Sequence, residues 1–139
     1  MSNWLRARVS TQIKNPKRSL FDKACEEMGY KPDYTVKEVH GAYSFDESRP
    51  VDCVLRSLAT GKVTTIGFHF NRNEKKEVIL SVTGDFFMMP YDGETFMKRL
   101  AMHYTHVQLC ETLEEQGYTI EESRIKEDEI VLVGARMAA

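Results

Sequence analysis

Apolar and polar residues alternate along much of this chain, and the alternation predicts strands. Apolar side chains recur at every second position from Leu5 to Val9 and return at Ile13. A period of two residues places them on one side, which predicts a strand over residues 4–13 with one buried face. Strand-like patterns also occur over residues 34–39, 51–58, 63–70, 78–83, 118–125 and 130–137.

Two segments have the helical period instead. Asn15-Pro16 breaks the first strand, and proline is favoured in the first turn of a helix. The apolar residues of this first helix recur at helical spacing up to Gly29: Leu20, Phe21, Ala24, Cys25 and Met28. A second, longer helix is predicted after Asp92-Gly93, with an apolar stripe formed by Phe96, Leu100, Tyr104, Val107 and Leu113.

The predicted order is therefore β-α-β-β-β-β-α-β-β in a single domain over residues 1–139. Neither a linker nor a low-complexity segment interrupts it. Strands with alternating faces and few helices predict an antiparallel sheet. We expect an α+β two-layer sandwich in which both helices cover one face of that sheet.

Nearly identical letters end both helices: EEMGY at Glu26–Tyr30 and EEQGY at Glu114–Tyr118. Glycine just after a helix adopts the left-handed conformation that lets the chain turn back. We interpret both motifs as helix stops and their paired glutamates as solvated helix faces. A duplication of a strand–helix–strand–strand unit would also produce the pattern.

Composition narrows the classes of protein that the chain can represent. It has 139 residues, of which 42% are hydrophobic and 29% charged, with a formal net charge of −2. Such a chain has no overall field that would attract nucleic acid or an anionic membrane. Three widely spaced cysteines predict reduced thiols and a cytoplasmic protein. The N-terminal residues MSNWLRARVS lack the apolar core of a signal peptide, and we expect no membrane association.

The strongest candidate for chemistry is HYTHVQLC on the second helix. His103, His106 and Cys110 are spaced three and four residues apart, which places them along one side of the helix. A structural zinc site needs four ligands, and no second set of ligands has matching spacing. A cysteine–histidine nucleophile would need an orienting group and an oxyanion site, and neither can be located. We therefore expect no metal, no cofactor and no catalytic residue, and we lean against an enzyme.

The outer face of the first strand is a candidate binding surface. Trp4, Arg6 and Arg8 alternate with the apolar positions, and Arg56, His69 and Arg136 are expected on the same face. An aromatic residue between basic residues is typical of single-stranded nucleic-acid platforms. Those platforms usually carry several exposed aromatic residues, so we favour a solvated face or one covered by a protein partner or second subunit.

A second candidate surface is the loop GDFFMMPYDG between the fifth strand and the second helix. Phe86, Phe87, Met88 and Met89 form an apolar run that is dense for a loop. The run either plugs the open end of the sandwich, which we favour, or forms a sticky patch for a partner.

The second half of the chain resembles a known family in three stretches: GDFFMMP, FMKRLAMHYTHVQLCETLEEQGYTI and EIVLVGARM. They are similar to the plastid, cyanobacterial, bacterial and phage family of the hypothetical chloroplast open reading frame thirty-five, a domain of unknown function. The residues that carry the resemblance are Asp85, Phe86, Arg99, Tyr104, Gly117, Tyr118 and Arg136. The first half matches more loosely, through the Gly29-Tyr30 helix stop and the IGFHFN strand. Members of the family often have Trp in the loop before the second helix, where this chain has Phe and Met.

The resemblance implies a soluble domain without a cofactor. Through the gene neighbourhood of that family, it also implies an accessory role beside an AAA-type ATPase. We expect a non-enzymatic protein-interaction or adaptor module, with a protein partner or a homo-oligomer. A nucleic-acid-binding domain that uses the basic and aromatic outer face is the alternative.

Overall fold

The computed structural model describes residues 4–8, 13–42, 47–86, 89–126 and 129–136. These residues form two helices and nine strands, and every strand pair is antiparallel. The elements are β1 (Trp4–Arg8), α1 (Arg18–Glu27), β2 (Tyr30–Asp33), β3 (Glu38–His40), β4 (Ser48–Pro50), β5 (Cys53–Ser57), β6 (Val63–Arg72), β7 (Val78–Asp85), α2 (Gly93–Glu115), β8 (Tyr118–Lys126) and β9 (Glu129–Arg136). The predicted α+β class is confirmed, with one helix after the first strand and one before the last two.

The region of the second predicted strand contains a turn that separates β2 from β3. Asp33 Oδ1 accepts hydrogen bonds from the backbone N–H of Thr35 at 2.9 Å and from its hydroxyl at 2.5 Å. An aspartate that bonds the residue two positions on forms a local turn, which competes with continued strand pairing. The structure therefore has β2 before this turn and β3 after it, and only β3 overlaps the strand that the alternation predicts over residues 34–39.

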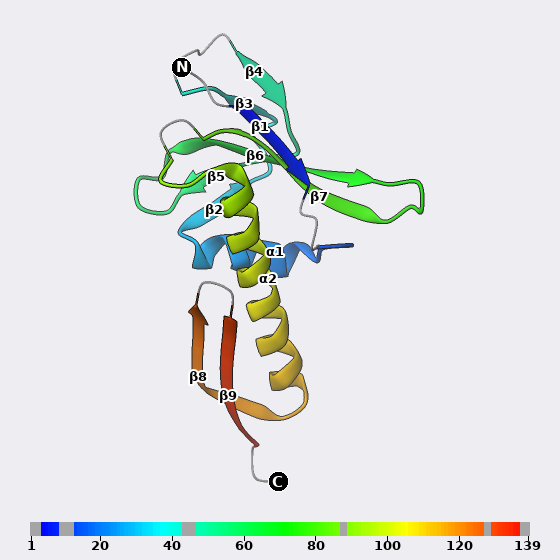
Figure 1. The fold of residues 1–139 in the computed structure, drawn as a ribbon, viewed down its shortest axis with the longest axis vertical. Helices are drawn as coiled ribbons and strands as arrows, with labels where there is room; N and C mark the ends of the chain where they lie inside the picture. Colours follow the sequence, from blue (N-terminus) through cyan, green and yellow to red (C-terminus); the bar gives the residue numbers. More distant parts are fainter. Residues whose placement is uncertain (1–3, 9–12, 43–46, 87–88, 127–128, 137–139) are drawn as a thin grey trace.

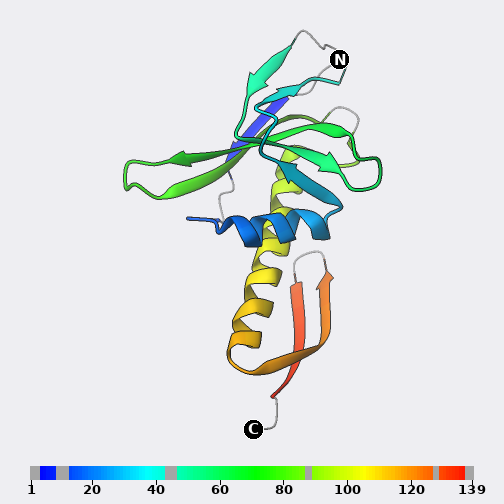
Figure 2. The same ribbon diagram turned by 180° about the vertical axis from the view of Figure 1, so that it is seen from behind.

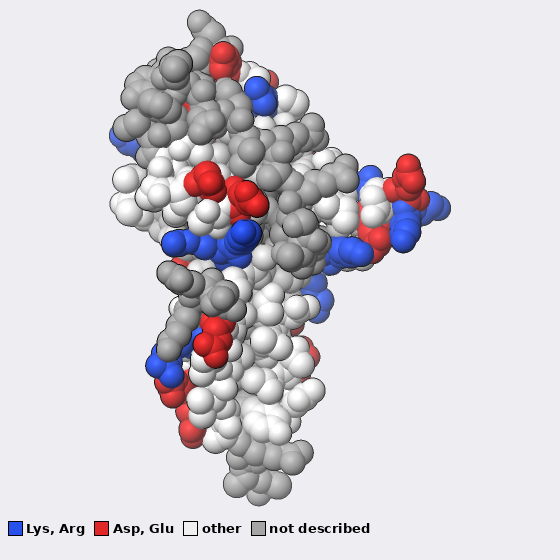
Figure 3. Space-filling model, viewed as in Figure 1, with Lys and Arg blue, Asp and Glu red and all other residues white. Residues whose placement is uncertain are grey.

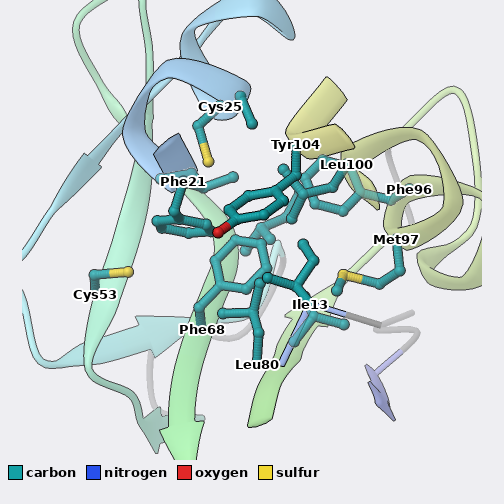
Figure 4. Packing of buried hydrophobic residues seen from close by; sticks show 14 of the residues in the cluster. Ile13, Phe21, Cys25, Cys53, Phe68, Leu80, Phe96, Met97, Leu100 and Tyr104 are labelled. Atoms are coloured by element: carbon teal, nitrogen blue, oxygen red, sulfur yellow. The ribbon is translucent and has the colours of Figure 1, made fainter. Parts of the chain in front are cut away.

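The main sheet has five strands in the order β1-β7-β6-β5-β2, and both helices lie against one of its faces (Figures 1 and 2). Alternate side chains of β6, namely Ile66 and Phe68, point into this core and are fully buried. Phe21 of α1 packs edge-on against Phe68, with ring centroids 5.2 Å apart (Figure 4). Phe96 of α2 lies on the other side of Phe68, with centroids 6.2 Å apart.

The opposite face of the main sheet is covered in part by the small β3-β4 sheet. Val39 of β3 packs with Val51 and Val54 in a second apolar cluster. Beside this cluster, Asp85 is only 1% exposed, and its Oδ2 accepts a 2.9 Å hydrogen bond from the backbone N–H of Ala42. Asp85, the aspartate of the GDFFMMP stretch, thus ties the segment after β3 to β7.

The C-terminal hairpin β8-β9 is a separate two-stranded sheet. Figure 1 shows that α2 runs beyond the main sheet and that the hairpin lies beside its C-terminal half. The expectation that Arg136 shares a sheet face with Arg56 and His69 is wrong, because β9 does not belong to the main sheet.

Three of the four helix ends are as the sequence predicts. The start of α1 differs, because the helix begins at Arg18 with Lys17 as its N-cap, so Pro16 precedes the helix and does not lie in its first turn. Asp92 caps α2, and its side chain accepts a hydrogen bond from the backbone N–H of Thr95 at 2.8 Å. Gly29 after α1 has φ +94° and Gly117 after α2 has φ +88°. Both positive angles are those that favour glycine, so EEMGY and EEQGY are confirmed as helix stops.

Candidate functional site

A polar cluster joins α1, α2 and β8. Oε1 of Glu27 lies 2.8 Å from Nδ1 of His103 and 2.9 Å from Nδ1 of His106. Nε2 of His106 contacts Oγ of Ser123 and lies 3.6 Å from Sγ of Cys110. Glu27, His103, His106, Cys110 and Ser123 are called the polar junction below.

Local structure explains how the polar junction forms. His103, His106 and Cys110 follow one another along one side of α2, as their spacing predicts. Glu27 is the last residue of α1, where the chain turns at Gly29, and the two helices pack against each other there. Glu27 is exposed, as the interpretation of a solvated helix face predicts, and its carboxylate also bonds both histidines, which the sequence does not show.

The polar junction has the chemical groups of a hydrolytic site in part only. An ionised Glu27 accepts the Nδ1–H of His106, which leaves Nε2 to accept the Ser123 hydroxyl, and this order of groups is that of a serine triad. A hydrolytic site also needs a pocket that holds the substrate beside these groups, and the residues of the polar junction line neither of the two pockets described below. Burial, then the charges of Glu27 and Glu114, raise the pKa of the Cys110 thiol, so the thiol stays protonated and is a weak nucleophile. The arrangement supports a structural tie between the hairpin and the rest of the molecule.

Metal binding has no support in the described geometry. Among the residues that the structure describes, no group of three or more His, Cys, Asp and Glu side chains is arranged to hold a metal ion. Both histidines direct Nδ1 toward the same oxygen of Glu27, which uses that lone pair for hydrogen bonding. The three cysteines are free, and burial raises the pKa of Cys25 and of Cys53, the latter to about 12.

The apolar loop before α2 is partly described. Phe86 is 4% exposed and packs against Phe96, with ring centroids 5.9 Å apart. Met89 is partly buried against the same core. These two residues plug the end of the sandwich, which is the interpretation that the sequence favours, while Phe87 and Met88 lie outside the described residues.

The strand-1 candidates are described by their backbone alone. Trp4 pairs with Asp85, Arg6 with Thr83 and Arg8 with Ser81. The side chains of Trp4, Arg6 and Arg8 lie outside the described residues. Their three β7 partners, Asp85, Thr83 and Ser81, are 1%, 3% and 4% exposed. The face of the main sheet opposite the helices is therefore buried along β7.

Sequence reasoning missed the surface of the C-terminal part of the molecule. Beyond Val107, none of the described side chains, at residues 108–125 and 129–135, is buried. Leu109 of α2 and Val133 of β9 are each 42% exposed. The C-terminal apolar surface is defined here by five half-buried or exposed residues: Met102, Leu109, Leu113, Val131 and Val133. Figure 3 shows that the surface over the lower half of α2 and the adjoining hairpin is mostly uncharged, with charged atoms mainly along its margins.

Two pockets lie away from the polar junction. One, of about 280 Å³, is a polar cleft between the segment that precedes α1 and α2, and Tyr104 closes it by accepting a 3.1 Å hydrogen bond from the backbone N–H of Lys17. The other, of about 710 Å³, lies between the β3 segment and β5-β6 and includes Val36, Val54 and Val63. Neither contains the paired nucleophile and base that a hydrolytic site requires.

The fold and the polar junction define an antiparallel α+β domain that carries a helix–hairpin extension. The chain belongs to the family described as protein of unknown function (DUF1257), whose model matches residues 24–133. The matched segment begins within α1 and ends in β9, so it includes all five residues of the polar junction. No curated protein and no solved structure matches the chain.

Neither helix is suited to crossing a bilayer: within the described part of the chain, none combines the length and the hydrophobicity that a membrane span requires.

Proposed function

We propose that this protein is a non-enzymatic interaction module that docks protein partners through the C-terminal apolar surface. One observation carries the proposal: beyond Val107, none of the described side chains is buried, although many of them are apolar. Soluble monomers rarely leave large connected apolar patches in water, and such patches commonly mark interfaces. The resemblance to the hypothetical chloroplast open reading frame thirty-five family supports an AAA-type ATPase as a partner.

Helix α2 supports the proposal because it is apolar on two sides. Phe96, Leu100 and Tyr104 face the core of the main sheet and are buried. Met102 and Leu109 lie on another side of the helix and remain half-buried or exposed. A helix that only covers a sheet needs one apolar stripe and a polar outer side. The second stripe is consistent with a second packing partner.

The polar junction supports the same function by holding the extension in place. Strands β8 and β9 contact α2 and make few contacts with the main sheet. Because Ser123 of β8 reaches His106, and His106 is held by Glu27 of α1, the hairpin is tied to both helices. A positioned surface loses less conformational entropy on binding than a mobile one.

Binding to a purified AAA-type ATPase from the family's gene neighbourhood tests the proposal. Titration calorimetry would compare the wild type, the double variant L109E/V133E and the matched control L58E/V63E. Leu58 and Val63 are 53% and 47% exposed but lie at the other end of the molecule, beside the β5-β6 turn. We expect the wild type and the control to bind alike and L109E/V133E to bind at least about tenfold more weakly, since buried charges are penalised at an apolar interface.

Equal binding by both variants would contradict docking through this surface. Binding of labelled single strands that weakens steeply with salt would instead favour the nucleic-acid alternative, because phosphate contacts release counterions. No described contact favours that alternative now. Its residues Trp4, Arg6 and Arg8 have side chains outside the described residues.

A further inference from the structure

The larger of the two pockets, about 710 Å³ in volume, runs along one edge of β3. Ligand sites have volumes of roughly 300–1,000 Å³, so its size suits a bound segment. Its described lining includes residues 35–38 and 40–42, which belong to β3 and its flanks, and no described residue of β4. Among the described strands, β3 pairs with β4 alone. The pocket, called the β3 groove below, therefore lies beside the edge of β3 that faces away from β4.

The hydrogen bonds of β3 leave main-chain groups on the groove side. The backbone N–H of Val51 donates to the C=O of Lys37 at 2.9 Å, so Lys37 bonds toward β4. In an antiparallel pair, successive residues direct their N–H and C=O groups alternately toward the partner strand and away from it. Glu38, which lies opposite Pro50, therefore directs both groups away from β4 and toward the groove. An edge with such outward groups is a template for a further strand.

Proline distinguishes the two edges of this small sheet. Pro50 lies opposite Glu38, and by the same alternation it faces away from β3, at the outer edge of β4. Proline has no N–H to donate, and proline in an edge strand opposes the addition of another strand. Strand β2, at the edge of the main sheet, also contains Pro32. The β3 edge has a donor at Glu38, so we expect an added strand there rather than on β4.

The floor of the β3 groove is apolar and carries one fixed cation. Val54 and Val63 lie on the floor, and Val63 is 47% exposed. Arg56 is the cross-strand partner of Val63, so their side chains share this face of the sheet. Its Nε donates to Oδ2 of Asp33 at 2.7 Å and its Nη1 to the C=O of Gly61 at 3.0 Å. These two bonds hold the guanidinium group in place, and none of the described contacts uses Nη2.

The charges around the β3 groove favour an acidic partner. Lys37 and Arg56 are the lysine and arginine of the described lining, and Glu38 is its one carboxylate. Asp33 offsets part of the charge of Arg56, but both of its oxygens are occupied: Oδ1 bonds Thr35 and Oδ2 bonds Arg56. A guanidinium group binds carboxylates in a fixed, often bidentate geometry. A carboxylate flanked by aliphatic side chains is therefore complementary to the groove.

We propose that the β3 groove binds an extended peptide segment of a partner protein as a third strand beside β3. A carboxylate of the segment lies on Arg56, and the aliphatic side chains two residues to either side lie on the apolar floor. Residues two apart in a strand share one face, so the recognised pattern is aliphatic-x-acidic-x-aliphatic. Main-chain bonds to a sheet edge give affinity, and sites for alternate side chains give specificity. Strand β3 lies at the opposite end of the molecule from β8 and β9, so this inference goes beyond the proposed function (Figure 1).

Two synthetic peptides test the proposal by nuclear magnetic resonance of the nitrogen-15-labelled full chain. One is acetyl-Thr-Val-Thr-Glu-Thr-Val-Thr-amide, and the matched control has Lys in place of Glu. We expect the Glu peptide to shift the amide resonances of residues 36–42, Val54 and Val63. At saturation the amide of Glu38 should exchange at least about tenfold more slowly, because it donates to the added strand. The Lys peptide should bind at least about tenfold more weakly, since like charges repel at Arg56.

Matched variants assign the binding to the β3 groove. Val63→Glu places a carboxylate on the floor and should weaken binding of the Glu peptide at least about tenfold. Leu109→Glu, on the C-terminal apolar surface, should bind the Glu peptide as the wild type does. Both side chains are exposed, so we expect both variants to fold, and their amide spectra verify it.

Each outcome decides for or against the third strand. The absence of shifts with the Glu peptide at its highest soluble concentration would overturn the inference. Equal affinity for the two peptides would refute the role of Arg56, and shifts without slower exchange at Glu38 would refute strand addition. Equal binding of the Glu peptide by Val63→Glu and the wild type would place the site elsewhere. If L109E/V133E keeps the ATPase while the Glu peptide binds as expected, the proposed function fails and this inference stands.

Discussion

The main sheet and the C-terminal extension are both built from strands of alternating sequence, with opposite results for the burial of their apolar residues. Strands β5, β6 and β7 contribute fully buried residues such as Leu55, Phe68 and Leu80 to a core that both helices cover. The alternating residues of β8 and β9 face one helix and stay partly exposed. Alternation therefore shows that a strand has an apolar face, but the number of layers available decides whether that face is buried within the chain.

The largest expected difference between the two regions is in the free energy of unfolding that is lost when a large apolar side chain is replaced by alanine. Phe68→Ala removes a side chain with no exposed area that packs against Phe21 and Phe96. We expect a loss of about 3–5 kcal/mol in the free energy of unfolding, from lost transfer energy and a cavity. Leu109→Ala should cost less than about 1 kcal/mol in a monomer, because 42% of its surface is already in water. Urea denaturation measures both values, and similar losses would contradict the contrast.

The polar junction should matter to the extension more than to the main sheet. Glu27→Ala removes the acceptor of two histidines and should cost on the order of 1–2 kcal/mol, as expected for hydrogen bonds to a charged group. The loss should appear as faster hydrogen exchange in β8 and β9 while β5–β7 stay protected. Glu26→Ala, at the exposed preceding residue, is the control. If Glu26→Ala has the same effect as Glu27→Ala, the hydrogen bonds from Glu27 to His103 and His106 are not what holds the hairpin in place.

The two helix stops allow a matched comparison between the regions. A Cβ at Gly29 or Gly117 would meet nothing within 4 Å, so Gly→Ala at either position is penalised only by the positive φ. Each substitution should cost on the order of 1 kcal/mol. Gly29→Ala should lower the global melting temperature, whereas Gly117→Ala should mainly increase exchange in the hairpin. An unchanged melting temperature and exchange pattern for both would show that neither residue is a cap.

The smallest expected effect is an acid transition at the edge of the main sheet. Hydrogen bonds from Thr35, then from Arg56, lower the pKa of Asp33 from 3.8 to about 2. Because the folded pKa is depressed, its stabilisation is present above about pH 4 and is lost as pH falls toward 2. Asp33→Asn should remove this part of the pH dependence of the melting temperature between pH 5 and pH 2. A variant that follows the wild-type profile would show that Asp33 does not contribute to it.

The sequence predicts much of the fold because local patterns specify it. Phe68 and Ile66 recur with the period of a strand, and Asp92, Gly29 and Gly117 have local chemistry that starts or ends a helix. The turn at Asp33 depends on a side-chain hydrogen bond, which the alternation over residues 34–39 does not show. The hairpin is predicted as strands, but nothing in its alternation indicates that it leaves the main sheet.

The sequence predicts the proximity of three of the five residues of the polar junction. His103, His106 and Cys110 have the spacing of one helix side, so their proximity follows from helix geometry. Glu27 is separated from His106 by 79 residues, and Ser123 lies on a strand of its own. Contacts at such separation depend on how α1 and the hairpin dock on α2. The doubled EEMGY and EEQGY motifs identify the end of α1 as a helix stop without showing which glutamate is bonded.

Hydrogen exchange with and without the purified AAA-type ATPase tests most directly whether the extension is a docking surface. The account predicts that the ATPase increases the protection of the amides of β8, β9 and the second half of α2, as expected when a partner binds the folded form only. Protection of β5, β6 and β7 should change less, since their core is complete within one chain. Exchange in the extension that the ATPase leaves unchanged, or added protection confined to β5–β7, would contradict the account.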